Sequence, residues 1–234
     1  MQGTKQKLII ILGPTASGKS ELAVFLARSI KKHRLGDFKG AEIISADSRQ
    51  VYKYLDVGTN KVPGTWQKIH PNPPFLKEGT PPFVKGRLGG ILNVFMYKKI
   101  PHHCIDFVHP KHTYTVAEYK KCAQKAIIEI QNCGNIPLLV GGTGLYIRAV
   151  ADGMVLPEVP PNKKLRALLK KKSTAELFGV LQKLDPERAA AIDARNPRRL
   201  IRAIEICKAT GKQVPALRSQ SNFQTLFIGI KTNE

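Results

Sequence analysis

The apolar residues in the first half of the chain fall into two alternating patterns. Residues 7–12 (KLIIIL) form a nearly continuous apolar run, which is typical of a strand buried on both faces of a parallel sheet. Residues 21–32 instead repeat apolar side chains at helical spacing, beginning at Leu22. With a glycine-containing segment between them, the pattern predicts a strand, a loop and a helix in that order.

Similar patterns continue along the chain. Short apolar runs at residues 41–45, 138–141 and 226–230 predict further strands, and residues 116–130 carry apolar side chains on one side of a predicted helix. Strands that alternate with helices are typical of a parallel sheet covered by helices. We therefore predict an α/β fold whose core is a parallel sheet flanked by helices.

From residue 157 onward the chain becomes helical in pattern and basic in composition. Helices are predicted in this part at residues 163–172, 175–184 and 198–210. We interpret the region as a helical insertion, after which the chain returns to the sheet. The predicted segments are a core at residues 1–156, a helical insertion at 157–195, and a return helix and strand at 196–234.

One segment of the predicted core fits neither pattern. Residues 71–90 are rich in proline and glycine and contain a near-repeat, PPFLKEG followed by PPFVKG. So much proline and glycine resists the fixing of side chains in one geometry. We expect a flexible surface insertion without a catalytic role.

The charge of the chain narrows the choice of partner. It carries 38 basic and 17 acidic residues, a formal net charge of +21. Nucleic acid gains affinity for such a surface by releasing counterions, although a basic surface without a specific partner is an equal alternative on charge alone. Many of the basic residues lie in the helical segment: Lys163, Lys164, Arg166, Lys170, Lys171, Lys172, Arg195, Arg198, Arg199 and Arg202.

Composition argues against membrane proteins and against common metal sites. No apolar run approaches the ~20 residues needed to cross a bilayer, and the start of the chain lacks the pattern of a secretion signal, so we expect a cytoplasmic protein with no membrane partner. The four cysteines form no Cys-x-x-Cys pair. Neither a zinc site nor a redox dithiol is therefore indicated.

The segment GPTASGKS matches the phosphate-loop pattern G-x-x-x-x-G-K-[ST] and stands between a predicted strand and a predicted helix, as that motif requires. Its backbone N–H groups are expected to surround a diphosphate, with Lys19 reaching the phosphate oxygens and the Ser20 hydroxyl holding Mg²⁺. The predicted diphosphate-binding residues are Gly13, Pro14, Thr15, Ala16, Ser17, Gly18, Lys19 and Ser20. The motif alone does not distinguish a nucleotide from another diphosphate.

Two further loops follow predicted strands. Asp47 comes after the second strand, at the sheet edge where open α/β folds carry their reacting groups, and its carboxylate is a candidate proton acceptor. A helix N-cap is the alternative role for this aspartate. The segment GGTGLY follows a later strand and offers the Thr143 hydroxyl beside the same site, with a plain tight turn as the alternative.

Five blocks of the sequence, taken in order, closely resemble the tRNA dimethylallyltransferases, also called tRNA isopentenyltransferases. They are GPTASGKS, ISADSRQVYKYLDVGTNK, PHHCIDFVHPKHTYTVAEYKKCA, IPLLVGGTGLYIRAV and NPRRLIRAIEICKATGK. The resemblance implies a P-loop NTPase-like core with a helical insertion. It also implies transfer of a dimethylallyl group from dimethylallyl diphosphate to the exocyclic amine of the adenosine just 3′ of the tRNA anticodon, with Mg²⁺, by an enzyme that we expect to be a monomer.

Roles pass from the family to matching positions of this sequence. Asp47 corresponds to the presumed general base, and Lys19, Thr143 and Asp47 make up the predicted catalytic set. The positions that match tRNA-contacting stretches of the family are Asp47, Ser48, Arg49, Gln50, Thr143, Arg166, Arg198, Arg199, Leu200, Ile201 and Arg202.

Other functions remain open at this point. A small-molecule P-loop kinase shares the strand, loop and helix but needs an acidic Mg²⁺ ligand after a later strand, where this chain has GGTG. A prenyltransferase acting on free adenylate shares the loop and Asp47. Family members are usually longer and continue past the last strand with a basic helical region that includes an arginine at the diphosphate, so a truncated, tRNA-binding remnant without turnover is a third alternative.

Overall fold

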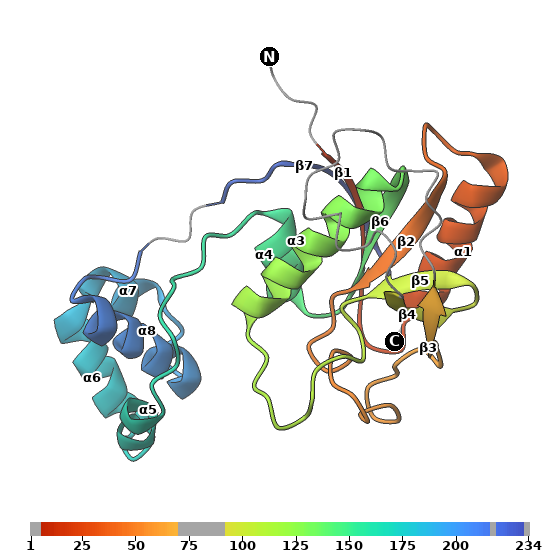
Figure 1. Cartoon of the computed structure of the whole chain (residues 1–234). Coiled ribbons are helices and arrows are strands. Elements are labelled where there is room, and N and C mark those ends of the chain that lie inside the picture. The colour runs from red at the N-terminus through yellow and green to blue at the C-terminus, as the bar shows by residue number, and fades with distance from the viewer. Residues whose placement is uncertain (1–5, 70–91, 216–218, 232–234) are drawn as a thin grey trace. The chain divides into compact units, whose positions relative to one another are not determined.

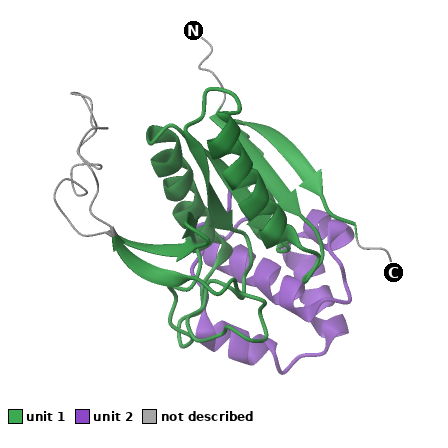
Figure 2. Ribbon diagram, turned by 90° about the vertical axis from the view of Figure 1, so that its right-hand side faces the viewer, with its two compact units in different colours: residues 1–154, 219–234 green, residues 155–218 purple. Residues whose placement is uncertain are grey.

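The computed structural model describes residues 6–69, 92–215 and 219–231. The predicted insertion at residues 71–90 lies outside these ranges. The chain divides into two compact units, one comprising residues 1–154 and 219–234 and the other residues 155–218, drawn in green and purple in Figure 2. None of the helices in the described ranges is both long enough and apolar enough to span a membrane.

The first unit is built on a seven-stranded sheet with the strand order β3-β4-β5-β2-β6-β1-β7 (Figure 1). Its strands are β1 (Gln6–Leu12), β2 (Gly40–Ser45), β3 (Thr65–Ile69), β4 (Leu92–Tyr97), β5 (Ile100–His103), β6 (Asn135–Gly141) and β7 (Phe223–Gly229). The five neighbouring strands β5, β2, β6, β1 and β7 run parallel to one another, whereas β4 pairs antiparallel with both β3 and β5. The predicted parallel sheet is therefore confirmed as the core of a mixed sheet.

Helices cover both faces of this sheet, as predicted. They are α1 (Lys19–His33), α3 (Val116–Asn132) and α4 (Gly144–Ala151). Successive residues of a strand point to opposite faces, so Ile10 of β1 packs with α3 and α4 while its neighbour Ile11 packs with α1. The same alternation separates Leu139 from Leu138 in β6. Burial on both faces explains why these strands are apolar throughout.

Strands β3, β4 and β5 were not predicted from the sequence pattern. The sequences of β3 (TWQKI) and β5 (IPHH) contain polar residues and proline where a buried parallel strand would be apolar. The antiparallel pair β3 and β4 lies at the edge of the sheet, where such residues are tolerated. The ladder of this pair reaches Ile69 opposite Leu92, so the proline- and glycine-rich segment connects two paired strands.

The second unit contains four helices with an apolar core of their own. They are α5 (Lys163–Leu169), α6 (Thr174–Leu184), α7 (Pro186–Ala191) and α8 (Pro197–Thr210). Leu200 and Ile204 of α8 pack in this core with Leu177 and Leu181 of α6. This corrects the predicted boundary at residue 195, because α8 belongs to the helical unit and only the strand at the end of the chain returns to the sheet.

Local sequence signals explain where these helices begin. Ser173 caps α6 in a capping box, in which its hydroxyl accepts from the Glu176 amide and the Glu176 carboxylate accepts from the Ser173 amide. Asn196 caps α8, and proline occupies the first turn. Each cap supplies hydrogen bonds that the first turn of a helix cannot make within itself.

The chain segments that enter and leave the helical unit approach each other closely. A β-carbon at Gly153, just before the unit, would overlap the carbonyl oxygen of Gln220, which follows it. Gly153 also has φ at 63°, in the left-handed region that favours glycine. The helical unit is therefore inserted into the first unit through two adjacent chain segments.

Replacing Leu181 by alanine should destabilise the helical unit by about 2–5 kcal/mol, because this side chain is fully buried and its removal leaves a cavity. Urea unfolding followed by circular dichroism measures the change. Leu168→Ala is the matched control, since Leu168 is 63% exposed in the same unit. Equal losses in the two variants would contradict the assigned core.

Candidate active site

The phosphate loop lies between β1 and α1, where the sequence places it. Gly18 is the N-cap of α1 with φ at 81°, and Lys19 and Ser20 occupy the first helical turn. Pro14, Thr15 and Ala16 are exposed, whereas Ser17 and Ser20 are half-buried. The backbone N–H groups and the positive end of the helix dipole at this terminus favour the binding of an anion.

Lys19 bridges the two ends of this loop. Its ammonium group donates to the carbonyl oxygen of Pro14 and lies 3.4 Å from the hydroxyl of Ser17. Burial lowers the pKa of Lys19, and the negative charge of Asp47 opposes that lowering. Asp47, in the loop after β2, therefore lies close enough to the phosphate loop for its charge to act on Lys19.

Three loops meet at the carboxyl ends of β1, β2 and β6. A β-carbon at Gly141, the last residue of β6, would overlap the carbonyl of Ala46, which follows β2. The same carbonyl accepts the Thr143 amide at 3.1 Å. A β-carbon at Gly142 would lie 3.3 Å from the carbonyl oxygen of Gly13, at the start of the phosphate loop. The predicted residues of the first unit are thus brought to one edge of the sheet.

Asp47 caps the turn that follows β2. Its Oδ1 accepts the backbone amide of Arg49 at 2.8 Å and that of Gln50 at 3.4 Å. Among the described residues, none donates to Oδ2. The capping role and the proton-accepting role are therefore compatible, because one oxygen orients the carboxylate and the other has no protein donor.

Thr143 joins the loop after β6 to the loop that carries Asp47. Its hydroxyl oxygen accepts the backbone amide of Ser48 at 3.0 Å and lies 3.4 Å from the Ser48 hydroxyl. Thr143 therefore acts within the protein by positioning the turn that carries Asp47. The side chain of Arg49, in the same turn, is exposed and so is accessible to a ligand at this edge of the sheet.

Gln50 holds a different loop in place. Its side-chain carbonyl accepts the Ser45 hydroxyl at 3.1 Å, and its amide group donates to the carbonyls of Thr59 and Asn60 at 3.2 and 3.1 Å. The side chain of this predicted tRNA-contacting residue is thus engaged with protein groups on both ends. Its contacts tie Thr59 and Asn60 to the end of β2.

Lys61 is a buried organising residue that sequence reasoning missed. Its side chain is 3% exposed, and its ammonium group contacts Asp56 at 2.6 Å, Asp106 at 2.8 Å and the carbonyl of Tyr52 at 2.7 Å. Asp106 also accepts the indole N–H of Trp66 at 2.8 Å. The lysine of the GTNK segment therefore fixes the chain that follows the Asp47 turn. Its partners lie up to 45 residues away, so no local pattern indicates this role.

Ser20 is the predicted protein ligand of a metal ion. No cluster of three or more histidine, cysteine, aspartate or glutamate side chains suited to a metal occurs within the described ranges. Mg²⁺ commonly binds through one or two protein oxygens together with substrate phosphates. A single hydroxyl next to a phosphate loop fits that kind of site.

The remaining predicted residues lie in the helical unit. Glu205 of α8 is 1% exposed and binds two of them: Arg166 donates to it from Nε and Nη2 at 2.9 and 2.7 Å, and Arg202 donates from Nη1 at 2.5 Å. The Asn162 amide donates to the same carboxylate at 2.6 Å. Burial opposes the ionisation of Glu205, but these hydrogen bonds outweigh it and lower its pKa to about 2.

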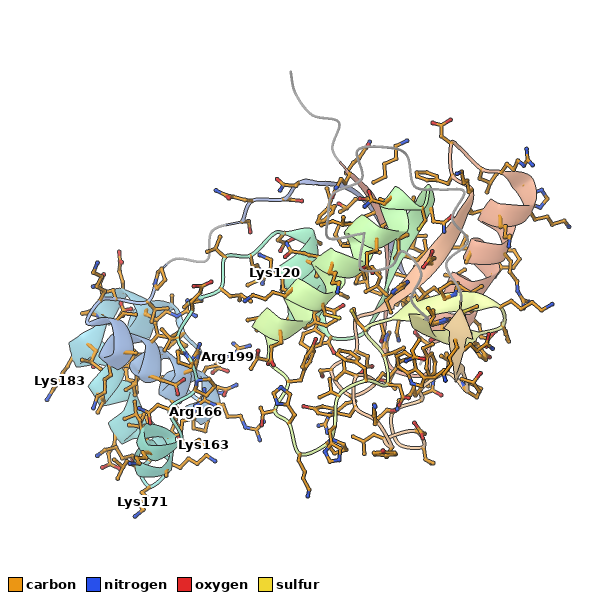
Figure 3. The ribbon with its side chains drawn as sticks, viewed as in Figure 1. Lys120, Lys163, Arg166, Lys171, Lys183 and Arg199 are labelled. Carbon is orange, nitrogen blue, oxygen red and sulfur yellow. The ribbon has the colours of Figure 1, made fainter. Side chains whose placement is uncertain are left out.

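The other predicted residues of α8 are divided between the surface and the core. Arg198 and Arg199 are exposed, whereas the side chains of Leu200 and Ile201 are buried, which leaves the arginines as the accessible groups of this stretch. In Figure 3, Arg199 lies on the same side of the unit as Arg166 and Lys163, whereas Lys183 lies on the opposite side. The basic residues of the helical unit therefore do not all share one face.

Comparisons with known proteins show which family the chain resembles. The model of the IPP transferase family matches residues 94–234. A tRNA dimethylallyltransferase from Acaryochloris marina is 36% identical over 97% of this chain. Among solved structures, a tRNA isopentenylpyrophosphate transferase from Bacillus halodurans is 34% identical with a TM-score of 0.50, and a eukaryotic dimethylallyltransferase acting on tRNA is 25% identical with a TM-score of 0.58.

The chain spans only part of the length of these proteins. It covers 63% of the Acaryochloris marina relative, 60% of the Bacillus halodurans protein and 48% of the eukaryotic one, while each comparison covers at least 96% of this chain. The similarity therefore includes both units described here.

Replacing Thr143 by valine should destabilise the first unit by about 1–3 kcal/mol, because the Ser48 amide loses its acceptor. Amide hydrogen exchange at Ser48 and thermal unfolding measure the effect. Thr143→Ser is the matched control that retains the hydroxyl and should keep most of the stability. Equal protection of the Ser48 amide in the valine and serine variants would rule out the positioning role of Thr143.

Acid should destabilise the helical unit through Glu205. The folded pKa of about 2 lies below the ordinary value of 4.5, so the stabilisation is present above about pH 4.5 and is lost as pH falls toward 2. Urea unfolding at pH 6, 4 and 3 measures this loss. The variant Glu205→Gln should be less stable at pH 6 and should lose less stability on acidification. A parallel decline in both proteins would assign the acid sensitivity to other groups.

Proposed function

Because the chain belongs to the IPP transferase family, we propose that it transfers a dimethylallyl group from dimethylallyl diphosphate to a tRNA. The acceptor is the exocyclic N6 amine of the adenosine 3′-adjacent to the anticodon, and pyrophosphate is released. The observation that carries this proposal is the meeting of a phosphate loop with an oriented carboxylate, Asp47, at one edge of the sheet. The transfer needs both groups, one for the leaving diphosphate and one for the proton.

The phosphate loop serves the leaving group. As the bond between the allylic carbon and the diphosphate oxygen breaks, negative charge grows on the departing pyrophosphate. Lys19 and the backbone amides of the loop stabilise that charge in the transition state. The Ser20 hydroxyl would hold Mg²⁺, which would supply further positive charge for the departing group.

Asp47 serves the acceptor. An exocyclic adenine amine is a weak nucleophile because its lone pair is delocalised into the ring. As the new carbon–nitrogen bond forms, the amine loses a proton, and the carboxylate of Asp47 accepts it through Oδ2, to which no residue in the described ranges donates. Thr143 maintains the orientation of the turn during this step.

The basic helical unit supports a tRNA acceptor over a free nucleotide. Arg198, Arg199 and the half-exposed Arg166 and Arg202 supply positive charge for RNA phosphates. A base that reacts at its exocyclic amine must leave the stacked anticodon loop, and phosphate contacts on the flanking backbone stabilise that arrangement. A free adenylate needs no such surface.

A kinase reaction is disfavoured by the end of β6. P-loop kinases carry a Mg²⁺-binding acidic residue after a later strand of the sheet. In this protein β6 ends at Gly141 and is followed by Gly142 and Thr143, whose contacts serve the Asp47 turn. The edge of the sheet thus supplies a proton acceptor instead of a second metal ligand.

The test is incorporation of radiolabelled dimethylallyl diphosphate into unmodified tRNA in the presence of Mg²⁺. Asp47→Asn keeps an oxygen that accepts the Arg49 amide but cannot take the proton, so transfer should fall by about 10²–10⁴-fold while donor binding persists. Lys19→Ala should weaken both donor binding and transfer.

The matched control is Asp37→Asn, an exposed aspartate of the same unit, which should transfer as the unaltered chain does. Equal loss of donor binding in the Asp47 and Lys19 variants would contradict this division of roles. If the label were incorporated into free adenylate but not into tRNA, the acceptor would be the free nucleotide and not the proposed tRNA adenosine.

A further inference from the structure

We propose that Glu205 is a positioning residue for tRNA binding, which holds the guanidinium groups of Arg166 and Arg202 in the orientation that binds RNA phosphates. The proposal rests on the function proposed above and assigns a role to a residue that does not itself contact RNA. Glu205 is buried and acidic, so a search for basic surface residues does not find it.

Glu205 forms hydrogen bonds with both arginines and so restricts the orientation of their side chains. The pair with Arg166 is bidentate, with two hydrogen bonds of 2.9 and 2.7 Å, and Arg202 binds the Oε2 atom that Arg166 also contacts. Arg202 is held at a second point, because its Nη2 donates to the carbonyl of Val159 at 2.9 Å. The Asn162 amide completes the shell of the carboxylate. Four hydrogen bonds from three residues therefore determine one orientation of the carboxylate and of each guanidinium group.

Burial and charge at this cluster suit a phosphate. Glu205 is 1% exposed, whereas the side chains of Arg166 and Arg202 are each 35% exposed and can reach a ligand. Two arginines around one carboxylate leave a local charge of +1. A hollow of about 490 Å³ beside Glu205 is also lined by Lys163, Lys164 and Lys208, which adds positive charge next to the pair.

Fixed arginines bind with less loss of freedom. A free arginine side chain loses rotamer entropy when it is immobilised by a ligand. Here that cost is met during folding, and each guanidinium group retains N–H donors that Glu205 does not use, since arginine has five. Groups that are already oriented bind a phosphate more tightly than mobile ones of equal charge.

A purely electrostatic role and a positioning role predict opposite signs. If Glu205 acted only through its charge, its removal would strengthen binding to a polyanion, because one negative charge near the arginines would be lost. If it positions the arginines, its removal weakens binding, because the side chains become mobile or turn away. The affinity for RNA therefore distinguishes the two roles directly.

The experiment measures binding of an unmodified tRNA transcript to the 234-residue chain over a range of salt concentrations. Glu205→Gln should bind about tenfold more weakly, the loss expected when charge-assisted contacts are no longer oriented. Glu158→Gln is the matched control, since it removes one exposed negative charge from the same unit and should bind equally or slightly more tightly. Unchanged or tighter binding by Glu205→Gln would overturn the proposal.

A second pair of variants keeps the test valid if Glu205→Gln fails to fold, which thermal unfolding reports. Arg166→Lys and Arg202→Lys preserve the charge but lose the forked geometry. Each should bind tRNA several-fold more weakly with a nearly unchanged salt dependence, because the number of positive charges is the same. Affinities equal to that of the unaltered chain would refute the need for oriented guanidinium groups.

Failure of this proposal is distinguishable from failure of the proposed function. Salt-dependent tRNA binding by the unaltered chain, weakened by Arg198→Ala, supports the helical unit as the tRNA-binding surface. If that binding is present and the Glu205 and lysine variants match it, only the positioning role is lost. If the unaltered chain does not bind tRNA at all, the proposed function and this inference fall together.

Discussion

The close approach of Gly141 to the carbonyl of Ala46 is the constraint on which the site depends. Only a residue without a side chain allows β2 and β6 to end at the same level and so close together. The Thr143 amide and hydroxyl then reach the loop after β2, which fixes the turn that carries Asp47. Because β1 lies on the other side of β6, the phosphate loop joins the same edge, and Lys19 feels the charge of Asp47.

The two units hold their polar side chains in place in different ways. In the first unit, polar groups stand on loops at the edge of a sheet that is buried on both faces, so a rigid scaffold fixes them. In the second unit, the fixed point is an ionised carboxylate inside the fold. Its desolvation is offset by four hydrogen bonds from Arg166, Arg202 and the Asn162 amide. Both arrangements place charged side chains at the surface with little remaining freedom.

Much of the first unit could be predicted from local pattern. The apolar runs of β1, β2 and β6 and the spacing of α1 and α3 are visible in sequence because burial on one or both faces dictates them. The phosphate loop was predictable because its pattern is itself local. Strands β3 to β5 were not, since their short, partly polar sequences are strands only through pairing with neighbours.

Contacts between distant residues account for what sequence reasoning did not find. The family resemblance places Gln50 in a tRNA-contacting stretch. In the structure its side chain forms hydrogen bonds with Ser45, Thr59 and Asn60. The cluster at Glu205 depends on Asn162 and Arg166, which lie 43 and 39 residues away in the sequence, and the assignment of α8 to the helical unit depends on its packing against α6. Likewise Cys104 and Cys122, which share no motif, bring their sulfur atoms to 2.8 Å. Such pairings are properties of the folded chain and leave no periodic trace.

The near contact of Gly153 with Gln220 bears on how such a protein is assembled over evolutionary time. A module whose two ends emerge side by side can be lengthened, shortened or exchanged without stretching the host sheet, because the host needs only the short distance between the ends to be spanned. The chemistry at the sheet edge and the surface offered by the helices are thus free to diversify separately. A change in the surface of the helical unit would require no rebuilding of the loops at the sheet edge.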